Sequence, residues 1–367
     1  MDMRHDGSPM PADPRPDGAT SDPPHRQRRW RVLAAVLVGL VSIGLLLWVA
    51  PLDEVIEQIR HMNPAWVLGA VAFEIGSCLS YVIIFRRFFP EPPRSVSRTV
   101  AWIAMGAGAV LPGGNISSAA ATGVLLRRHG IGTRRLVTRC AALLSLLTGL
   151  GFAVNGIAGV WLLLGLPGGP HDLSHTGIPI LVSVGVLGAA TLIAYCGRRL
   201  GATAPRPVRA VTAGLHAAWS SVRATHWRLV GAVGFLCLDM AALWAACAAT
   251  GHPLGFPATV IAYCIGYLAT AVPMPAGLGV LDTGLAAALV LYGLPPAASV
   301  GAVLVYHAIA IWVPGTGGLA AWLPVMRQRI TRPVIQARLT GPQNLLSPDA
   351  ARLSPSTQYS PAPTPVD

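Results

Sequence analysis

The chain consists of long apolar stretches separated by short clusters of arginine. A helix needs about 20 apolar residues to cross the hydrocarbon of a bilayer, and six stretches approach that length. We therefore predict an all-α fold, a polytopic bundle of transmembrane helices. The predicted spans cover about residues 32–50, 64–85, 140–164, 178–196, 229–249 and 297–323.

The arginine clusters orient these spans, because positively charged residues are retained on the cytoplasmic side. The first span follows the cluster RQRRWR, and the predicted loop after it, up to the second span, carries Asp53, Glu54 and Glu57, so the first span runs outward. The second span returns to Arg86 and Arg87. Threading the remaining spans in this way places both termini in the cytoplasm, and we expect the cytoplasmic (inner) membrane of a bacterium.

Between Arg98 and Arg127 the chain is too short for two crossings. Both residues belong to clusters that we expect to face the cytoplasm, and 28 residues separate them. Two crossings need about 20 residues each. We therefore predict a re-entrant hairpin of two half-length helices, which turns at the sequence Pro112-Gly113-Gly114-Asn115.

Residues 257–292 form a second short apolar segment, which the sequence VPMPAGLG interrupts near its middle. We predict a second re-entrant hairpin here, and the preceding spans make it enter from the outside. The last stretch, 297–323, then crosses inward. Three tight full spans over the same residues remain the alternative.

The two broken segments, 111–131 and 274–294, align without a gap. Since they enter from opposite faces, we predict two inverted repeats, one over about 64–196 and one over about 229–325. Broken helices at matching positions of inverted repeats indicate a transport site at the bilayer midplane. An amphipathic cytoplasmic linker is predicted at 206–225, between the repeats. The matched positions are Pro112 with Pro275, Gly114 with Gly277 and Gly130 with Gly293.

Composition narrows the function classes. Only 11% of the residues are charged, against about a quarter in soluble domains. All 27 basic residues are arginine, which excludes lysine chemistry, and their position at span ends explains the net charge without nucleic acid as a partner. The sequence lacks catalytic and metal-binding motifs, so we expect no enzyme activity, metal or cofactor. The proline-rich ends, 1–28 and 326–367, are predicted to be disordered cytoplasmic tails that flank a membrane domain at 29–325.

Several motifs resemble those of one membrane-protein family. The second half contains PMPAGLGVLD, YGLPP and WVPGTGG, and the first half contains LPGG and LLRRHGI. These resemble the transmembrane domain of lysylphosphatidylglycerol synthases, the flippase part of multiple peptide resistance factors. The resemblance covers about residues 30–325 and implies a stand-alone flippase-like domain. Only about 40 residues follow it, so we expect no aminoacyltransferase domain and no lipid-lysylating activity.

The resemblance is incomplete at polar positions. Relatives usually carry Glu where this chain has Asp282, and often Arg where it has His307. They also carry acidic and basic residues where this chain has the sequence Ser117-Ser118-Ala119-Ala120. If the family's polar pairs contact a lipid headgroup, this chain lacks one set, and its substrate differs accordingly.

Polar residues within the apolar segments are the candidate translocation site. A carboxylate at the bilayer centre costs about 2.5–3.5 kcal/mol on insertion scales, so Glu74, Asp239 and Asp282 indicate function. His307 can pair with a carboxylate or titrate near neutral pH. The alternatives are a helix cap, an interhelical hydrogen bond or a satisfied core residue. Broken helices also leave N–H and C=O groups for a substrate at the two predicted tips. The tip candidates are Pro112, Gly113, Gly114, Asn115, Ser117, Ser118, Pro273, Pro275, Gly277 and Gly279.

From these features we predict a flippase that moves the headgroup of an anionic or polyprenyl-linked membrane lipid between leaflets through a midplane cavity. Two alternatives stay open. One is a secondary transporter of a small polar solute, proton-coupled through Asp282 or Glu74. The other is a non-transporting membrane partner of an envelope-biosynthesis enzyme, with the basic loop at 198–228 as its docking surface.

Overall fold

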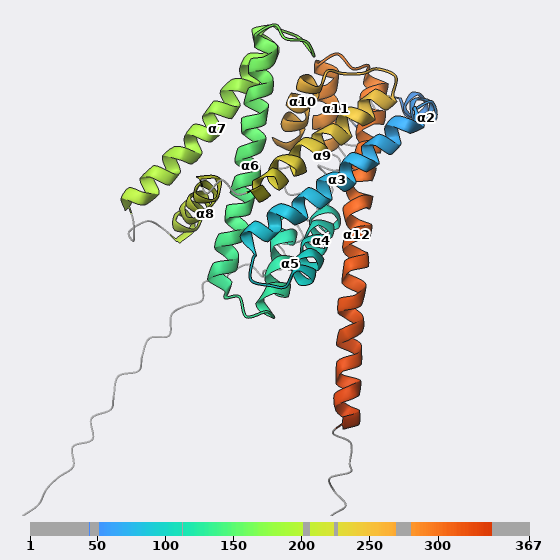
Figure 1. Ribbon diagram of the computed structural model, residues 1–367. Coiled ribbons are helices and arrows are strands. Elements are labelled where there is room, and N and C mark those ends of the chain that lie inside the picture. Colours follow the sequence, from blue (N-terminus) through green and yellow to red (C-terminus); the bar gives the residue numbers. More distant parts are fainter. Residues whose placement is uncertain are drawn as a thin grey trace, which may run out of the picture.

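The computed structural model describes residues 51–111, 113–200, 206–223, 227–268 and 280–339, together with Gly44. These residues form helices and loops without any strand, so the all-α prediction is confirmed (Figure 1). The first predicted span, 32–50, and the N-terminal tail lie outside the described residues, apart from Gly44. Among the described helices, five are long and apolar enough to cross a membrane: Pro64–Phe88, Thr133–Leu163, Leu173–Arg199, Trp227–Ala249 and Pro296–Arg327.

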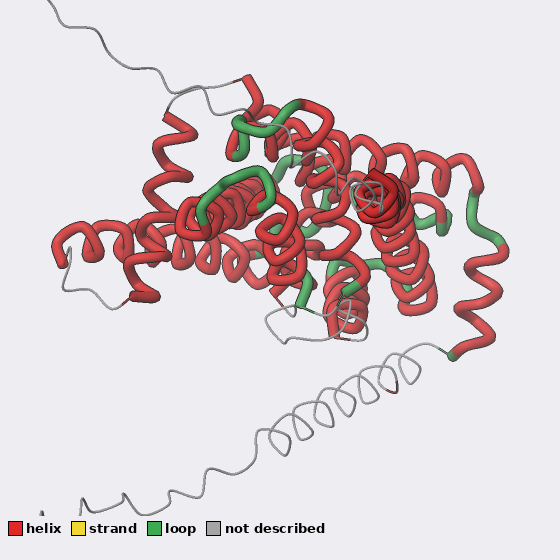
Figure 2. The backbone as a smooth tube through the Cα atoms, turned by 90° about the horizontal axis from the view of Figure 1, so that it is seen from below, coloured by secondary structure: helices red, strands yellow, loops and turns green. Residues whose placement is uncertain are grey.

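Helices joined by short loops make up the bundle, and Figure 2 shows them packed side by side when viewed from below. The longest is α12, which ends well beyond the other helices in Figure 1. The elements are α2 (Leu52–Arg60), α3 (Pro64–Phe88), α4 (Arg94–Val110), α5 (Asn115–Arg127), α6 (Thr133–Leu163), α7 (Leu173–Leu200), α8 (Arg206–Arg223), the 3₁₀ turn η2 (Trp227–Leu229), α9 (Val230–Ala249), α10 (Phe256–Leu268), α11 (Val280–Leu291) and α12 (Pro296–Leu339).

Helices α3 and α9 pack antiparallel along their length at the centre of the bundle (Figure 1), and small residues bring them close together. A Cβ atom added to Gly231 would lie 2.7 Å from the carbonyl oxygen of Ser80, and one added to Gly234 would lie 2.7 Å from the Ser80 hydroxyl. Small residues are the usual means of close helix packing in membranes, where apolar side chains gain little by leaving lipid. The α3–α9 contact is therefore set by glycine on α9.

Two pairs of short helices lie at opposite ends of the bundle in Figure 1. Helices α4 and α5 pack against each other at the lower end, and α10 and α11 pack against each other at the upper end. Each pair also contacts a long helix from the other half of the chain, because α4 packs on α12 and α10 packs on α6. Each predicted interruption, near residue 112 and near residues 270–280, therefore falls between the two short helices of one pair.

Helix α2 corrects the prediction for residues 51–63, which were expected to form a loop. Leu52, Val55 and Ile59 recur at helical spacing, and Val55 is buried where α2 packs on α12. The Gln58 side-chain amide donates a hydrogen bond of 2.9 Å to the carbonyl of Thr250. Burial of Val55 and this hydrogen bond attach the helix to the bundle, whereas Leu52, Ile56 and Ile59 stay exposed, and the charge-based reading of this segment overlooked the helix.

Helix α12 continues past the predicted start of the C-terminal tail at residue 326 and ends at Leu339. Residues 326–339 include Pro333, which disfavours a helix interior, but most of the others, such as Met, Arg, Gln and Leu, favour helix. The helix therefore continues through the segment where composition predicted the tail to begin.

Helix α8 occupies the predicted linker and presents apolar side chains on its surface. Val211, Trp219 and Val222 are exposed, whereas Gly214 packs on α6, where an added Cβ atom would lie 3.0 Å from the Cβ atom of Ala141. Exposed apolar residues interleaved with arginine are typical of a helix that lies in the membrane interface.

Candidate functional site

The polar centre of the bundle is built around Asp239, near the middle of α9. The Asp239 carboxyl is buried and accepts hydrogen bonds at both oxygens. Tyr306 of α12 donates to Oδ1 at 2.8 Å, and Tyr263 of α10 donates to Oδ2. Buried polar groups are stable only when they are paired, so three helices are held in register by this one carboxyl.

Glu74 of α3 completes this group, which we call the carboxyl–tyrosine cluster: Glu74, Asp239, Tyr263 and Tyr306. Glu74 is buried, and its carboxyl lies near enough to that of Asp239 for the two to interact. Cys78, one turn along α3, approaches Glu74 Oε1 at 3.7 Å, but Oε2 is buried without a hydrogen-bond partner. Two carboxylates this close in apolar surroundings repel unless a proton lies between them.

The tyrosines were missed from the sequence, although a signal for them existed. A buried tyrosine hydroxyl usually finds a hydrogen-bond partner, and the apolar segments 256–268 and 296–323 each contain tyrosine. Tyr263 also stacks on Tyr267 with ring centroids 4.4 Å apart. Which carboxyl such hydroxyls bind depends on contacts between helices that are distant in the sequence.

A second buried acid pairs with the histidine that the sequence singled out. Asp282 lies in the first turn of α11, and its Oδ1 is 2.5 Å from Nδ1 of His307 on α12. Both side chains are buried. His307 follows Tyr306 directly, so consecutive residues of α12 bind the two acids Asp239 and Asp282.

The first predicted tip is differently placed. Gly113 and Gly114 form the α4–α5 turn with positive φ angles of 94° and 45°. Asn115 begins α5 and is exposed, whereas Ser117 and Ser118 in the same helical turn are partly buried. The structure thus gathers the predicted acids into the core and leaves these polar residues at the start of a short helix. The other predicted tip residues lie outside the described residues: Pro112, Pro273, Pro275, Gly277 and Gly279.

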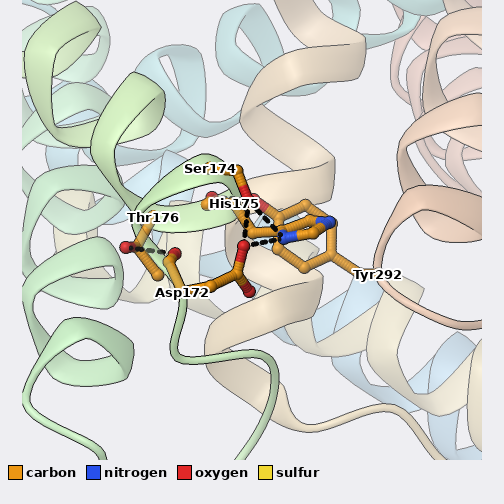
Figure 3. Close-up of polar contacts among 5 residues, drawn as sticks. All are labelled: Asp172, Ser174, His175, Thr176 and Tyr292. Carbon is orange, nitrogen blue, oxygen red and sulfur yellow. Dashed lines mark hydrogen bonds and ion pairs between the residues drawn. The ribbon is translucent and has the colours of Figure 1, made fainter.

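A third polar group, at the start of α7, contains Asp172, Ser174 and His175 (Figure 3). Ser174 donates to Asp172 Oδ2, and His175 Nδ1 lies 2.5 Å from the same oxygen. These hydrogen bonds lower the pKa of Asp172 to about 2. In a catalytic triad the serine and the acid bind opposite nitrogens of the histidine ring, whereas here Ser174 Oγ and Asp172 Oδ2 both face Nδ1 of His175, at 3.2 and 2.5 Å. We interpret the group as a helix cap, supported by the amide of Thr176, which donates to the Asp172 carbonyl at 3.2 Å.

This cap also joins the start of α7 to the end of α11, which are distant in the sequence. The Tyr292 hydroxyl, just after α11, donates to the backbone carbonyl of His175 at 2.6 Å. The role of the Asp172–Ser174–His175 group is therefore structural. In the described part of the chain, no group of three His, Cys, Asp or Glu side chains is placed to hold a metal ion.

Comparison with known proteins identifies the family. The family described as "Lysylphosphatidylglycerol synthase TM region" matches residues 32–318, which confirms the resemblance carried by the sequence motifs. A search of the curated proteins finds no match. The matched segment includes α3 to α11 and half of α12, and with them both buried acid groups. Because it covers most of the 367 residues, the chain belongs to the family of the transmembrane region of lysylphosphatidylglycerol synthases.

Proposed function

We propose that this protein moves the headgroup of an anionic or polyprenyl-linked lipid between membrane leaflets, without catalysing a covalent reaction. The observation that carries the proposal is the carboxyl–tyrosine cluster at the α3–α9 contact. Uncompensated acids are costly in a membrane and are a default indication of function. Family membership supports the same conclusion, because the resemblance implies a flippase-type domain.

An internal repeat supports this proposal. Pro112 and Pro275 are 163 residues apart, and the same offset relates the helix ends of the two halves. It carries the start of α3 at Pro64 onto Trp227, where the 3₁₀ turn leading into α9 begins, and the start of α6 at Thr133 onto Pro296, where α12 begins. We infer that α3–α6 and α9–α12 are two copies of one unit.

Backbone conformation at matched glycines agrees with this repeat. Gly130 follows α5 with φ 79°, and Gly293 follows α11 with φ 102°. These left-handed conformations are the usual end of a helix and favour glycine, which has no Cβ atom. The aligned glycines therefore end the second short helix of both pairs in the same way.

Helix contacts between the copies are also reciprocal. The central contact joins α3 to α9, which are equivalent positions. The contact of α4 with α12 is matched by that of α10 with α6, as an approximate two-fold relation requires. We propose that this two-fold is inverted, that each short pair is re-entrant, and that the arginine-rich end of the bundle faces the bacterial cytoplasm with both termini on that side.

The test is lipid movement in proteoliposomes. Fluorescent phosphatidylglycerol and a fluorescent polyprenyl phosphate are placed in both leaflets. A membrane-impermeant reductant then quenches the fluorescence of the lipids in the outer leaflet. Wild-type protein should expose the inner pool, and Asp239→Asn and Asp282→Ala should slow exposure at least about tenfold, a barrier change of about 1.4 kcal/mol. Asp172→Asn, an exposed acid in a loop, is the matched control. A wild-type protein that moves neither lipid refutes the flippase proposal.

A second candidate function is supported by the same acids. A proton shared by Glu74 and Asp239, or held by the Asp282–His307 pair, would suit a proton-coupled transporter of a small polar solute. This alternative predicts that a pH gradient drives solute uptake into proteoliposomes and that Glu74→Gln abolishes the dependence on the gradient. Lipid movement that is independent of a pH gradient favours the flippase.

A further inference from the structure

A pocket between the end of α3 and the start of α4 has arginine at three of its five lining positions. It has a volume of about 320 Å³, and we call it the arginine pocket: Val82, Arg86, Arg94, Ser95 and Arg98. Arg86 comes from the last turn of α3, and Arg94 and Arg98 come from successive turns of α4. Arg228 of η2 also lies close enough to Arg86 for the two charges to repel.

Neighbouring acids do not neutralise this charge. Residues 75–171 contain nine arginines and one acid, Glu91. That acid is engaged elsewhere, because Arg139 Nη1 lies 2.6 Å and Arg135 Nη1 3.9 Å from its carboxylate. Within the described part of the chain, no carboxylate forms an ion pair with Arg86, Arg94 or Arg98.

Two further features of the pocket favour an anion. Arg86 Nε is buried without a hydrogen-bond acceptor in the described residues. The first turn of α4 has no side-chain cap, since Pro93 precedes it, so its amide N–H groups and helix dipole add to the positive potential. Guanidinium groups bind phosphate oxygens with paired hydrogen bonds, which suits a tetrahedral anion better than a chloride ion.

The walls of the pocket favour a lipid over a soluble phosphate. Val82 lines it on the α3 side. Leu79 and Ile83, on the same side of α3 and nearer its middle, expose 53% and 37% of their surface. An apolar stripe therefore runs from the arginines along α3, in the position that the glycerol and acyl chains of a bound lipid would occupy.

We propose that the arginine pocket binds the phosphate of an anionic phospholipid headgroup at the arginine-rich face of the membrane. Arg86, Arg94 and Arg98 hold the phosphate, and the exposed side of α3 receives the chains. The pocket deepens the proposed function by giving the lipid a docking site before it moves. The lipid binding itself does not depend on transport.

The test is lipid binding by the purified full chain in neutral detergent, measured by native mass spectrometry with phosphatidylglycerol and phosphatidylcholine. The double variant R94Q/R98Q should bind phosphatidylglycerol at least about tenfold more weakly than wild type, which corresponds to about 1.4 kcal/mol. The matched control R127Q/R128Q removes two exposed arginines at the end of α5 and should bind like wild type. Thermal unfolding checks that both variants are folded.

Each outcome decides the proposal. Equal binding by wild type and R94Q/R98Q, or an equal loss in both double variants, overturns it. Inorganic phosphate that displaces phosphatidylglycerol at equal concentration identifies a soluble anion as the ligand and overturns the lipid assignment. Binding that is lost only in R94Q/R98Q supports the pocket even where lipid movement fails, so the two proposals fail separately.

Discussion

Adding one methyl group at Gly318 should destabilise the bundle, because α4 and α12 touch through their backbones there. A Cβ atom at Gly318 would lie 2.9 Å from Gly106 Cα and 2.9 Å from the carbonyl oxygen of Trp102. Backbone atoms cannot turn aside as a flexible side chain can, so the helices must separate. Overpacking of this kind costs about 1–3 kcal/mol. This contact also accounts for the glycines of the WVPGTGG motif.

The assay is reversible unfolding in mixed detergent micelles, with the free energy of unfolding compared between variants. Gly318→Ala should lose about 1–3 kcal/mol. Gly149→Ala is the matched control, because Gly149 lies within α6 and an added Cβ atom has no neighbour within 4 Å. Alanine favours helix over glycine, so this control should be at least as stable as wild type.

A double variant tests the geometry more sharply. Gly106→Ala alone should also force the helices apart, since its Cβ atom would lie 2.9 Å from the carbonyl oxygen of Pro314. Once the first methyl group has separated the helices, the second one clashes less. The loss of unfolding free energy in the double variant should therefore be smaller than the sum of the two single losses. Wild-type stability of Gly318→Ala, or an equal loss in Gly149→Ala, would refute the backbone contact.

Three smaller predictions concern hydrogen bonds. Hydrogen bonding lowers the pKa of Asp172 from 3.8 to about 2, so its cap stabilises the fold above about pH 4 and is lost as the pH falls toward 2; acid unfolding of wild type and Asp172→Asn should converge there. Tyr306→Phe removes the 2.8 Å hydrogen bond to Asp239 and should cost about 0.6–1.7 kcal/mol of unfolding free energy, whereas an unchanged value contradicts the hydrogen bond. Glu91→Gln breaks the partly exposed contact with Arg139 and should cost under about 1 kcal/mol, an effect that high salt removes; a loss that persists in high salt would exclude an ion pair.

The arrangement of the long helices was predictable because hydrophobicity and arginine placement determine it locally. The predicted spans at 64–85, 140–164, 178–196 and 229–249 correspond to the long helices α3, α6, α7 and α9. Helix α2 also carries a helical pattern of apolar residues, but its acids were given more weight than its periodicity. The start of the C-terminal tail at residue 326 was likewise predicted from composition, and α12 continues past it.

The site was less predictable, because it depends on tertiary packing. The acids stood out singly, since each interrupts an apolar segment. Their hydrogen-bond partners did not stand out, because Tyr263 and Tyr306 are 24 and 67 residues away from Asp239 in the sequence. The contact of Glu74 with this group likewise depends on how α3 packs along α9.

We propose that the two short helix pairs enter the membrane from opposite faces, as an inverted repeat requires. Cysteine accessibility tests it in intact cells with an impermeant thiol reagent, after replacement of the six native cysteines. The outside reagent should label Phe256→Cys and Pro295→Cys, at the ends of the α10–α11 pair. It should not label Pro93→Cys or His129→Cys, at the ends of the α4–α5 pair, until the membrane is permeabilised. Labelling of both pairs from the same face would contradict the inverted repeat.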